Sequence, residues 1–222
     1  MTRIQREIVR AAFRLAFAYP KTDLDNPPRA LDDLIYIILS GQTSEINYQR
    51  AYATLRARYP DWEAARRAPA RSIERAIRGA GLSVQKARYI KAILARVHAD
   101  FGETSLDGLA DWPTGDAETY LRRLPGVGVK TARCVLLYTL GRDVFPADVH
   151  CLRIMERAGW LKRGKRRMED VADAAQALVL PAIRRELHIS LVQHGRAVCK
   201  PVRPECRRCC IAECCRWGKK SR

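Results

Sequence analysis

The sequence of 222 residues lacks the long apolar runs and the leader that mark membrane and secreted proteins. No stretch approaches the ~18 consecutive apolar residues of a membrane-spanning helix. The N-terminal segment has neither the apolar core nor the small-residue cleavage site of a signal peptide. We therefore expect a cytoplasmic protein, associated with the nucleoid if the source is bacterial or archaeal, in a compartment that keeps cysteines reduced.

Acidic residues are few relative to basic ones. The chain has 41 Lys and Arg against 24 Asp and Glu, a formal net charge of +17. A chain this basic is attracted to polyanions, above all to the phosphates of nucleic acids. Ribosomal proteins and proteins of anionic membrane surfaces share this property. The charge therefore predicts the kind of partner and not the activity.

The alternation of apolar and polar residues that marks half-buried strands is missing as well. Helical periodicity recurs instead, with short polar connections, so we predict an all-α fold without internal repeats. The most apolar segment, residues 31–39, is expected to be a buried helix, and Thr43 or Ser44 to cap the helix after it. Further helices are predicted at residues 45–59, 62–68, 72–79, 85–101, 118–124, 130–140, 149–159, 169–180 and 182–194.

Residues 124–132 (LPGVGVKTA) join two of these helices through a turn with two glycines. Pro125 ends the first helix, because the residue before a proline is pushed out of the helical region. Gly126 and Gly128 allow a tight turn and close approach of the backbone to another molecule. The second helix starts at once, so its first amides and positive dipole end can bind a phosphate. An ordinary helix–turn–helix corner is the alternative, and the basic chain and the adjacent Lys130 favour the phosphate site.

Four cysteines near the C-terminus have gaps of six, two and five residues: Cys199, Cys206, Cys209 and Cys215. Thiolates in a reducing compartment bind soft metals. A structural zinc site usually has two close pairs about a dozen residues apart, whereas this compact loop suits an iron–sulfur cubane. We predict a [4Fe-4S] cluster, with zinc as the alternative. Cys210 and Cys214 leave the register ambiguous by one residue. Cys134 and Cys151 lie on apolar helix faces and are expected in the core.

Together these motifs resemble the endonuclease III branch of the helix-hairpin-helix DNA glycosylases. The glycine hairpin with its lysine, an aspartate eighteen residues further on (Asp148) and the cysteine spacing carry the resemblance. It extends over nearly the whole chain and includes LSGQT at 39–43, Gly81-Leu82 with Lys86-Ala87, and HGR at 194–196. The family implies a two-lobed all-α fold, with a helical barrel at residues 31–141. Residues 1–30 and 142–222 would form the cluster lobe, with DNA in the cleft between.

The resemblance implies that Lys130 is the nucleophile and Asp148 the essential carboxylate. A lysine in the first turn of a helix meets the positive dipole end, so its pKa should fall and its amine become available. The amine could then attack the sugar C1′ and form a Schiff base. An aspartate at a helix N-terminus should stay ionised and stabilise a cationic sugar. The plain alternatives are a solvated lysine and an N-cap aspartate.

A glycosylase takes its target base out of the stack, and side chains must fill the gap. By resemblance, Gln42 fills the gap and Leu82 acts as a wedge; the alternatives are a surface turn residue and a core anchor. The DNA-binding residues that we predict are Gln42, Leu82, Gly126, Val127, Gly128, Thr131 and His150. We expect a monomer that binds duplex DNA with damaged bases or abasic sites and does not bind membranes.

Three positions near the expected pocket depart from the family pattern, and they bear on the choice of substrate. Val149 replaces a threonine, Ser83 a common aromatic residue and Arg122 a common acidic residue. Relatives that remove adenine from mismatches have a glutamate on the helix before the Gln42 turn. Residues 35–39 of this helix contain no acid, which argues against that activity. We therefore predict a bifunctional glycosylase and abasic-site lyase of base excision repair that acts on oxidised pyrimidines. The alternatives are a paralogue for alkylated, deaminated or otherwise modified bases, and a non-catalytic binder of damaged DNA.

Overall fold

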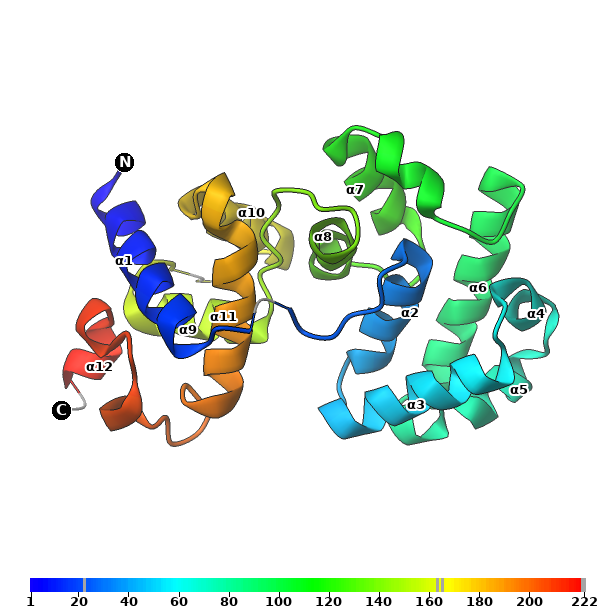
Figure 1. Ribbon diagram of the computed structural model, residues 1–222, viewed down its shortest axis with the longest axis horizontal. Coiled ribbons are helices and arrows are strands. Elements are labelled where there is room, and N and C mark those ends of the chain that lie inside the picture. Colours follow the sequence, from blue (N-terminus) through cyan, green and yellow to red (C-terminus); the bar gives the residue numbers. More distant parts are fainter. Residues whose placement is uncertain (22, 163, 165, 221–222) are drawn as a thin grey trace. The chain divides into compact units, whose positions relative to one another are not determined.

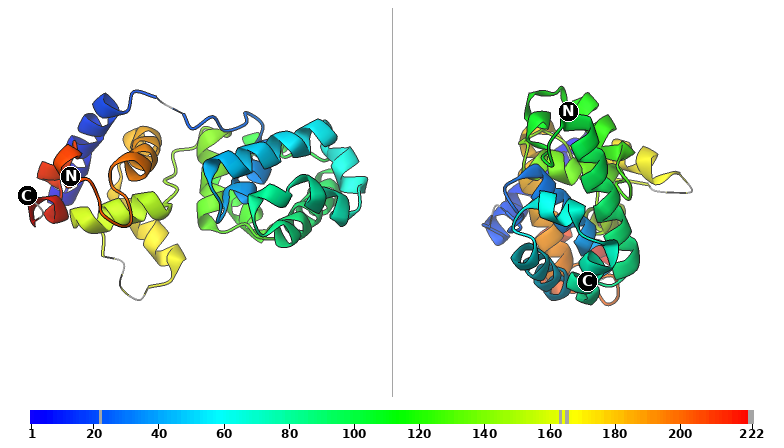
Figure 2. Two further views of the ribbon diagram at one scale, coloured as in Figure 1. Left: turned by 90° about the horizontal axis from the view of Figure 1, so that it is seen from below. Right: turned by 90° about the vertical axis from the view of Figure 1, so that its right-hand side faces the viewer.

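The computed structural model describes residues 1–21, 23–162, 164 and 166–220, and these contain helices and turns but no strand. The predicted all-α fold is confirmed. The chain divides into two compact units, here called the terminal unit (Met1–Asp25 with Asp143–Arg222) and the central unit (Asn26–Arg142) (Figures 1 and 2). Within the described residues, no helix has the length and apolar character needed to cross a membrane.

The central unit is organised around α2 (Ala30–Ser40), which is buried from its first residue to Leu39. A helix that is apolar on nearly all sides has to be covered by other elements. The helices packed against it are α3 (Glu45–Arg58), α6 (Ser83–Phe101) and α8 (Val129–Tyr138) (Figure 1). The unit is completed by α4 (Trp62–Arg67), α5 (Ala70–Ala76), α7 (Thr114–Arg123) and the 3-10 turns η1 (Arg78–Ala80) and η2 (Asp107–Asp111).

A buried lysine closes the C-terminal end of α2. Nζ of Lys86, on α6, donates to the carbonyl oxygens of Leu39, Gly41 and Ala80 at 2.7, 2.7 and 2.8 Å. Helix C-termini leave carbonyls without partners inside the helix, and a cation also suits the negative end of the dipole. Lys86 therefore holds the turn that carries Gln42 against the turn that precedes α6.

The terminal unit is organised around α11 (Arg184–Ala197), whose residues 187–192 are buried. It packs against both α1 (Arg3–Ala18) and α9 (Val149–Ala158), although α1 lies at the opposite end of the sequence. The remaining elements are α10 (Met168–Leu178), α12 (Arg216–Lys220) and the 3-10 turns η3 (Pro181–Ile183), η4 (Cys206–Arg208) and η5 (Ala212–Cys214). Two turns of 3-10 helix thus lie within the cysteine loop.

The predicted helix starts at residues 45, 62 and 149 agree with α3, α4 and α9, whereas those at 72, 85 and 182 differ from the structure by two residues. The predicted cap of α3 was partly wrong. Ser44 precedes α3 as its N-cap residue, but its side chain makes no capping hydrogen bond. The first residue of α3 is Glu45, whose charge can itself favour the positive end of the helix. Cys134 and Cys151 are both buried, as predicted.

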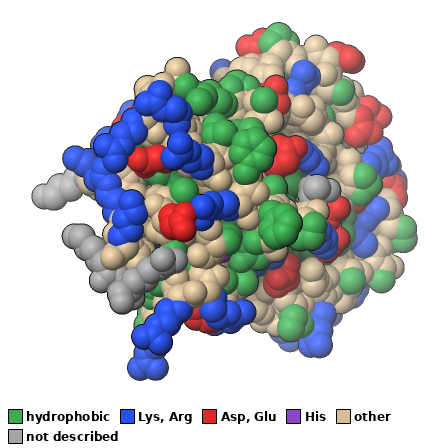
Figure 3. Space-filling view, turned by 60° about the vertical axis from the view of Figure 1, so that its left-hand side comes forward, with side chains coloured by type: hydrophobic (Ala, Val, Ile, Leu, Met, Phe, Trp, Pro, Cys, Tyr) green, Lys and Arg blue, Asp and Glu red, His purple; other side chains and the backbone are tan. Residues whose placement is uncertain are grey.

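Basic side chains are prominent on the surface. Figure 3 shows Lys and Arg side chains gathered along the left edge of one face, whereas Asp and Glu side chains are scattered singly over it. The surplus of basic residues is therefore partly concentrated, as binding to a polyanion requires.

Candidate functional site

A glycine hairpin joins α7 to α8. Leu124 is the C-cap residue of α7, and the amide of Val127 donates to the Leu124 carbonyl at 3.1 Å. Gly126 has a φ of +78°, which L side chains rarely adopt. A Cβ on Gly126 would also lie 2.5 Å from the ring of Tyr89, a residue of α6. The turn therefore requires glycine both for its backbone conformation and for the packing of Tyr89.

Gly128 has a different role, as the N-cap residue of α8. Its φ is −93°, and a Cβ added to it would meet no atom within 4 Å. Glycine has no side chain to accept the first-turn amides of the helix, which point out of the N-terminus together with the positive dipole end. Lys130 and Thr131, the next residues of that first turn, are both half-buried. Val127 is buried, so only its backbone is available for contact with a ligand.

The two candidates for filling the gap in DNA lie on neighbouring turns of the central unit. Gln42 and Leu82 both have left-handed backbone conformations, with φ of +53° and +49°. A Cβ on Gly81 would lie 3.6 Å from the Gln42 carbonyl, so the turns are in close proximity. Gln42 is exposed, and Leu82 retains 50% of its accessible surface. Leu82 is therefore not the core anchor that was its alternative role.

Asp148 is the N-cap residue of α9 in the terminal unit. Its Oδ1 accepts from the amide of Cys151 at 2.8 Å, which confirms the predicted cap. Val149 follows it with 70% exposure. His150 is held by Arg153, whose Nη2 donates to its Nδ1 at 3.0 Å, and burial lowers the pKa of His150. In a neutral His150, Nδ1 is therefore occupied by the hydrogen bond from Arg153.

Two arginines of α9, which sequence reasoning missed, tie the helix to the start of the cysteine loop. Arg153 donates to the carbonyls of Gly195 and Cys199 at 3.0 and 2.9 Å. Arg157 lies 3.3 Å from Sγ of Cys199 and donates to the carbonyls of Lys200 and Pro201 at 2.7 and 2.8 Å. The helix that begins at Asp148 is thus also the support of the predicted cluster ligands.

The four predicted cysteine ligands are half-buried. The Cys209 thiol is influenced by the charges of Cys210, Cys215 and Cys199, and the Cys215 thiol by those of Cys199 and Cys206. The four predicted ligands are therefore electrostatically connected, and Cys210 is connected to them through Cys209. Burial raises the pKa of Cys209 to about 12. In the part of the chain that the structure describes, no three His, Cys, Asp or Glu side chains have the arrangement of a metal site.

Two of these sulfurs have hydrogen-bonding neighbours, and the two spare cysteines have Arg14 nearby. Sγ of Cys209 lies 3.4 Å from Nε2 of His194, and Sγ of Cys215 accepts from the amide of Gly218 at 3.4 Å. Cys210 and Cys214 instead share the influence of Arg14 on α1, which lowers the pKa of both against the effect of burial. Three of the four predicted ligand sulfurs, those of Cys199, Cys209 and Cys215, thus have an N–H-bearing group within 3.4 Å.

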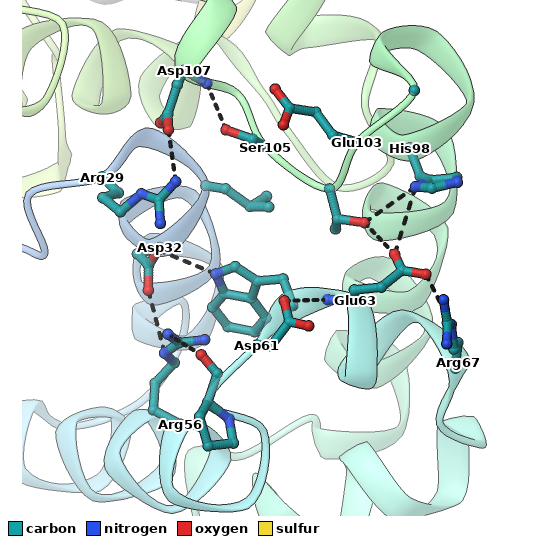
Figure 4. Close-up of a pocket in the computed structure, with 15 residues that line it drawn as sticks. Arg29, Asp32, Arg56, Asp61, Glu63, Arg67, His98, Glu103, Ser105 and Asp107 are labelled. Carbon is teal, nitrogen blue, oxygen red and sulfur yellow. Dashed lines mark hydrogen bonds and ion pairs between the residues drawn. The ribbon is translucent and has the colours of Figure 1, made fainter.

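The central unit also has a pocket of about 520 Å³ (Figure 4). Its walls are rich in charge, and three ion pairs lie among the lining residues: Arg29 with Asp107, Arg56 with Asp32, and Arg67 with Glu63. The predicted catalytic, DNA-binding and ligand residues are absent from its described lining. This pocket is therefore separate from the predicted site.

Comparison with known proteins shows the family. The model of the HhH-GPD superfamily base excision DNA repair proteins matches residues 35–186, and the chain belongs to that family. Endonuclease III of Thermotoga maritima is 28% identical over 217 residues, covering 98% of this chain and 92% of its own. The predicted resemblance to endonuclease III is thus confirmed. DNA glycosylase/AP lyase ROS1 of Arabidopsis thaliana is 29% identical over 172 residues, 70% of this chain and 12% of its own.

Another Arabidopsis thaliana relative, named as a candidate DNA glycosylase, is 41% identical over 133 residues. The chain spans 45% of that relative's length. Among solved structures, a trapped endonuclease III–DNA covalent intermediate has a TM-score of 0.84 and 25% identity, covering 100% of this chain and 99% of that one. A thermostable thymine-DNA glycosylase has a TM-score of 0.81 at 20% identity, which supports the fold alone.

Proposed function

We propose that this chain is a bifunctional DNA glycosylase and abasic-site lyase that acts on damaged duplex DNA in base excision repair. The observation that carries the proposal is Lys130 in the first turn of α8, directly after a glycine hairpin suited to phosphate. Membership of a base excision repair family supports it. So does similarity to a protein trapped covalently on DNA, since a covalent intermediate requires a nucleophile.

In this mechanism the neutral amine of Lys130 attacks C1′ of the damaged nucleotide. The bond to the base breaks, and the base leaves with the electron pair and takes up a proton. Opening of the sugar ring gives a Schiff base between Lys130 and C1′. Loss of a proton from C2′ then breaks the C3′–O bond by β-elimination and cleaves the strand. The positive dipole end of α8 favours the neutral amine over the ammonium.

Asp148 is proposed to stabilise the positive charge that develops on the sugar and to assist proton movement. Its position as the N-cap of α9 supports this role, because the amide of Cys151 and the helix dipole both favour the carboxylate form. A fixed anion near developing positive charge lowers the barrier without reorganising during the reaction.

Binding of DNA is proposed to use the backbone at the hairpin and side chains at the neighbouring turns. The amides at Gly126, Val127 and Gly128, with Thr131, would hold a phosphate. The exposed Gln42 and Leu82 would occupy the space that a flipped base leaves. His150 would face DNA from the terminal unit.

Oxidised pyrimidines are the proposed substrates, and the departures from the family pattern support a second candidate. The hydroxyl of Ser83 donates to Glu74 at 3.1 Å, and Val149 presents an apolar surface beside Asp148. Polar contacts that a threonine would supply next to Asp148 are thereby replaced by an apolar one. This favours a paralogue for alkylated, deaminated or otherwise modified bases as the alternative.

A [4Fe-4S] cluster is proposed in the terminal unit, held by Cys199, Cys206, Cys209 and Cys215. When bound, it would cross-link the C-terminal loop by four iron–thiolate bonds. Arg157 and the amide of Gly218 support this assignment, because donors to ligand sulfurs stabilise their negative charge. Zinc is the alternative metal.

The test of the proposed function is borohydride trapping on a duplex with one abasic site, followed by a panel of single-lesion duplexes. Lys130→Ala should abolish trapping and strand cleavage while DNA binding survives. Lys21→Ala is the matched control, because it removes an amine that pairs with Asp25 on the surface. Trapping by Lys130→Ala would show that another amine is the nucleophile. Absence of trapping in the parental protein would favour the non-catalytic binder.

A further inference from the structure

Two adjacent carboxyl groups at the start of α2 have very different surroundings. Asp32 accepts from the Tyr52 hydroxyl at 2.8 Å and from Nε1 of Trp62 at 3.1 Å, and it forms an ion pair with Arg56 at 3.3 Å. These three partners come from α3 and α4, so Asp32 links the helices of the central unit. Its role is structural.

Asp33 is fully buried and has much less support. Its Oδ1 accepts from Nδ2 of Asn26 at 2.5 Å. Its Oδ2 is also buried, yet it has no hydrogen-bond partner among the described residues. A buried carboxyl group with an unsatisfied oxygen is costly, and such a group calls for a reason beyond stability.

The cation that acts on Asp33 is Lys130. Burial is the largest influence and raises the pKa of Asp33 to about 7, whereas the Asn26 hydrogen bond and the charge of Lys130 lower it. Asp32 opposes them as a neighbouring anion. The geometry agrees, because α2 packs directly against α8, and each residue lies in the first turn of its helix.

Lys130 is the cation that influences Asp33, and two other cations close to α2 are engaged elsewhere. Arg56 on α3 pairs with Asp32. Lys86 on α6 binds carbonyl oxygens at the opposite end of α2. The interaction of Asp33 with positive charge is therefore directed to the helix that carries the proposed nucleophile.

We propose that Asp33 is the buried counter-ion of Lys130, whose carboxylate stabilises positive charge on Nζ. It stabilises the ammonium form first and the cationic Schiff base later, and it touches no part of the DNA. Asp33 thus acts through Lys130 and is a positioning residue. This inference rests on the proposed function, since it requires that Lys130 be the nucleophile.

The proposed counter-ion should change the pH at which the free amine of Lys130 forms, and the direction of that change can be measured. An ionised Asp33 favours the Lys130 ammonium, so the free amine forms at higher pH than it would alone. Asp33→Asn removes the charge and keeps the shape and the acceptor for Asn26. The acid limb of the pH profile for Schiff-base trapping should then shift to lower pH by about one unit.

Asp32→Asn is the matched control. It removes the adjacent carboxylate and should lower thermal stability more than Asp33→Asn, because Asn can accept at only one of the two oxygen positions that Tyr52, Trp62 and Arg56 use, and the ion pair with Arg56 is lost. It should leave the acid limb within about 0.3 units of the parental position. An unmoved or upward-shifted acid limb in Asp33→Asn would overturn the proposal, since a purely structural role would alter amplitude and stability alone.

Asn26→Ala is a second test of the counter-ion, for use if Asp33→Asn folds poorly. Asn26→Ala keeps the carboxyl group but removes the hydrogen bond that favours its ionised form, so the pKa of Asp33 rises. The acid limb should move in the same direction by a smaller amount, and no movement would again refute the counter-ion. Lys130→Ala separates the two hypotheses: if it still traps, the proposed nucleophile is wrong. If it does not trap and both pH profiles match the parental one, the counter-ion alone is wrong.

Discussion

The central and terminal units prepare their proposed catalytic residues by different means. Lys130 depends on a glycine hairpin and the start of a helix, and in our proposal also on Asp33, a buried carboxyl group on α2. Asp148 depends on a single capping hydrogen bond, but its helix is also joined to a distant loop through Arg153 and Arg157. The hairpin itself is compact in sequence, although Asp33 is distant, whereas the contacts of α9 extend about fifty residues, from position 148 to Cys199.

This difference indicates how each unit should respond to change. The hairpin should tolerate loss of the cysteine loop, because its contacts lie within the central unit. The start of α9 should be more sensitive, because two of its arginines are held by carbonyls and a thiol of that loop. The predictions below test this contrast, beginning with the largest expected effect.

Asp148→Asn should collapse base excision while leaving binding intact. The substitution keeps size and much of the capping geometry but removes the charge, an electrostatic loss typically worth roughly a hundredfold or more in rate. Single-turnover kinetics on one lesion duplex, with alkali cleavage to score excision, measures it. Asp170→Asn removes a comparable first-turn carboxylate from α10 and is the control. Excision at the parental rate would mean that Asp148 is only a helix cap.

Cys206→Ala should remove the iron and loosen the C-terminal loop. The purified parental protein should be yellow-brown, with broad absorption near ~400 nm and about four irons per chain, as four-thiolate ligation implies. Cys210→Ala and Cys214→Ala should retain the iron, because neither residue is one of the four predicted ligands and both thiols are influenced by Arg14. One zinc per chain in anaerobically prepared, colourless protein would contradict the cluster. If Cys206→Ala still binds DNA and is trapped through Lys130, the hairpin does not depend on the cysteine loop, as the contrast between the units predicts.

Gly126→Ala should destabilise the protein by about 2–4 kcal/mol, since it combines a positive φ with overlap against Tyr89. Gly128→Ala should cost less than ~1 kcal/mol, because its φ is negative and its Cβ meets no neighbour. Chemical denaturation of both variants measures the difference. Adding Tyr89→Ala to Gly126→Ala should recover the part due to overlap, and equal losses for the two glycines would refute the packing argument.

Affinity for undamaged duplex should fall by on the order of tenfold or more across physiological ionic strengths, because phosphate contacts release counter-ions. Titration of a fluorescent duplex at several salt concentrations gives the slope. Cys206→Ala should reduce the slope only slightly if the central unit supplies most contacts. A binding constant independent of salt would refute the electrostatic interpretation of the +17 charge.

Local features of the sequence were sufficient to predict most of the helices, although ends such as those of α5 and α11 differ from the prediction by three residues. Apolar content made α2 a buried helix, Pro125 ended α7, and Asp148 capped α9, because each effect acts over a few residues. The role of Ser44 was mispredicted in part, since its side chain makes no capping bond. The family motifs also led to the correct superfamily, which the match over residues 35–186 shows.

Long-range contacts could not be predicted in this way. Asp33 lies two positions before residues 35–39, outside the segment in which an acid was expected to matter. Nothing in the local sequence distinguishes it from Asp32, although one carboxyl group has three partners and the other has an unsatisfied oxygen. Tyr89 likewise gave no sign that it packs on Gly126.

The sequence by itself determined the helical class, the phosphate-compatible hairpin, the lysine and aspartate at helix starts, and the supply of clustered thiols. Periodicity, proline and glycine act through neighbouring backbone, so their consequences can be inferred without a fold. Only the tertiary structure decided which charges meet: Asp33 with Lys130, and Arg157 with Cys199. The strength of an interaction between charges depends on separation and burial, and both arise only when distant segments pack together.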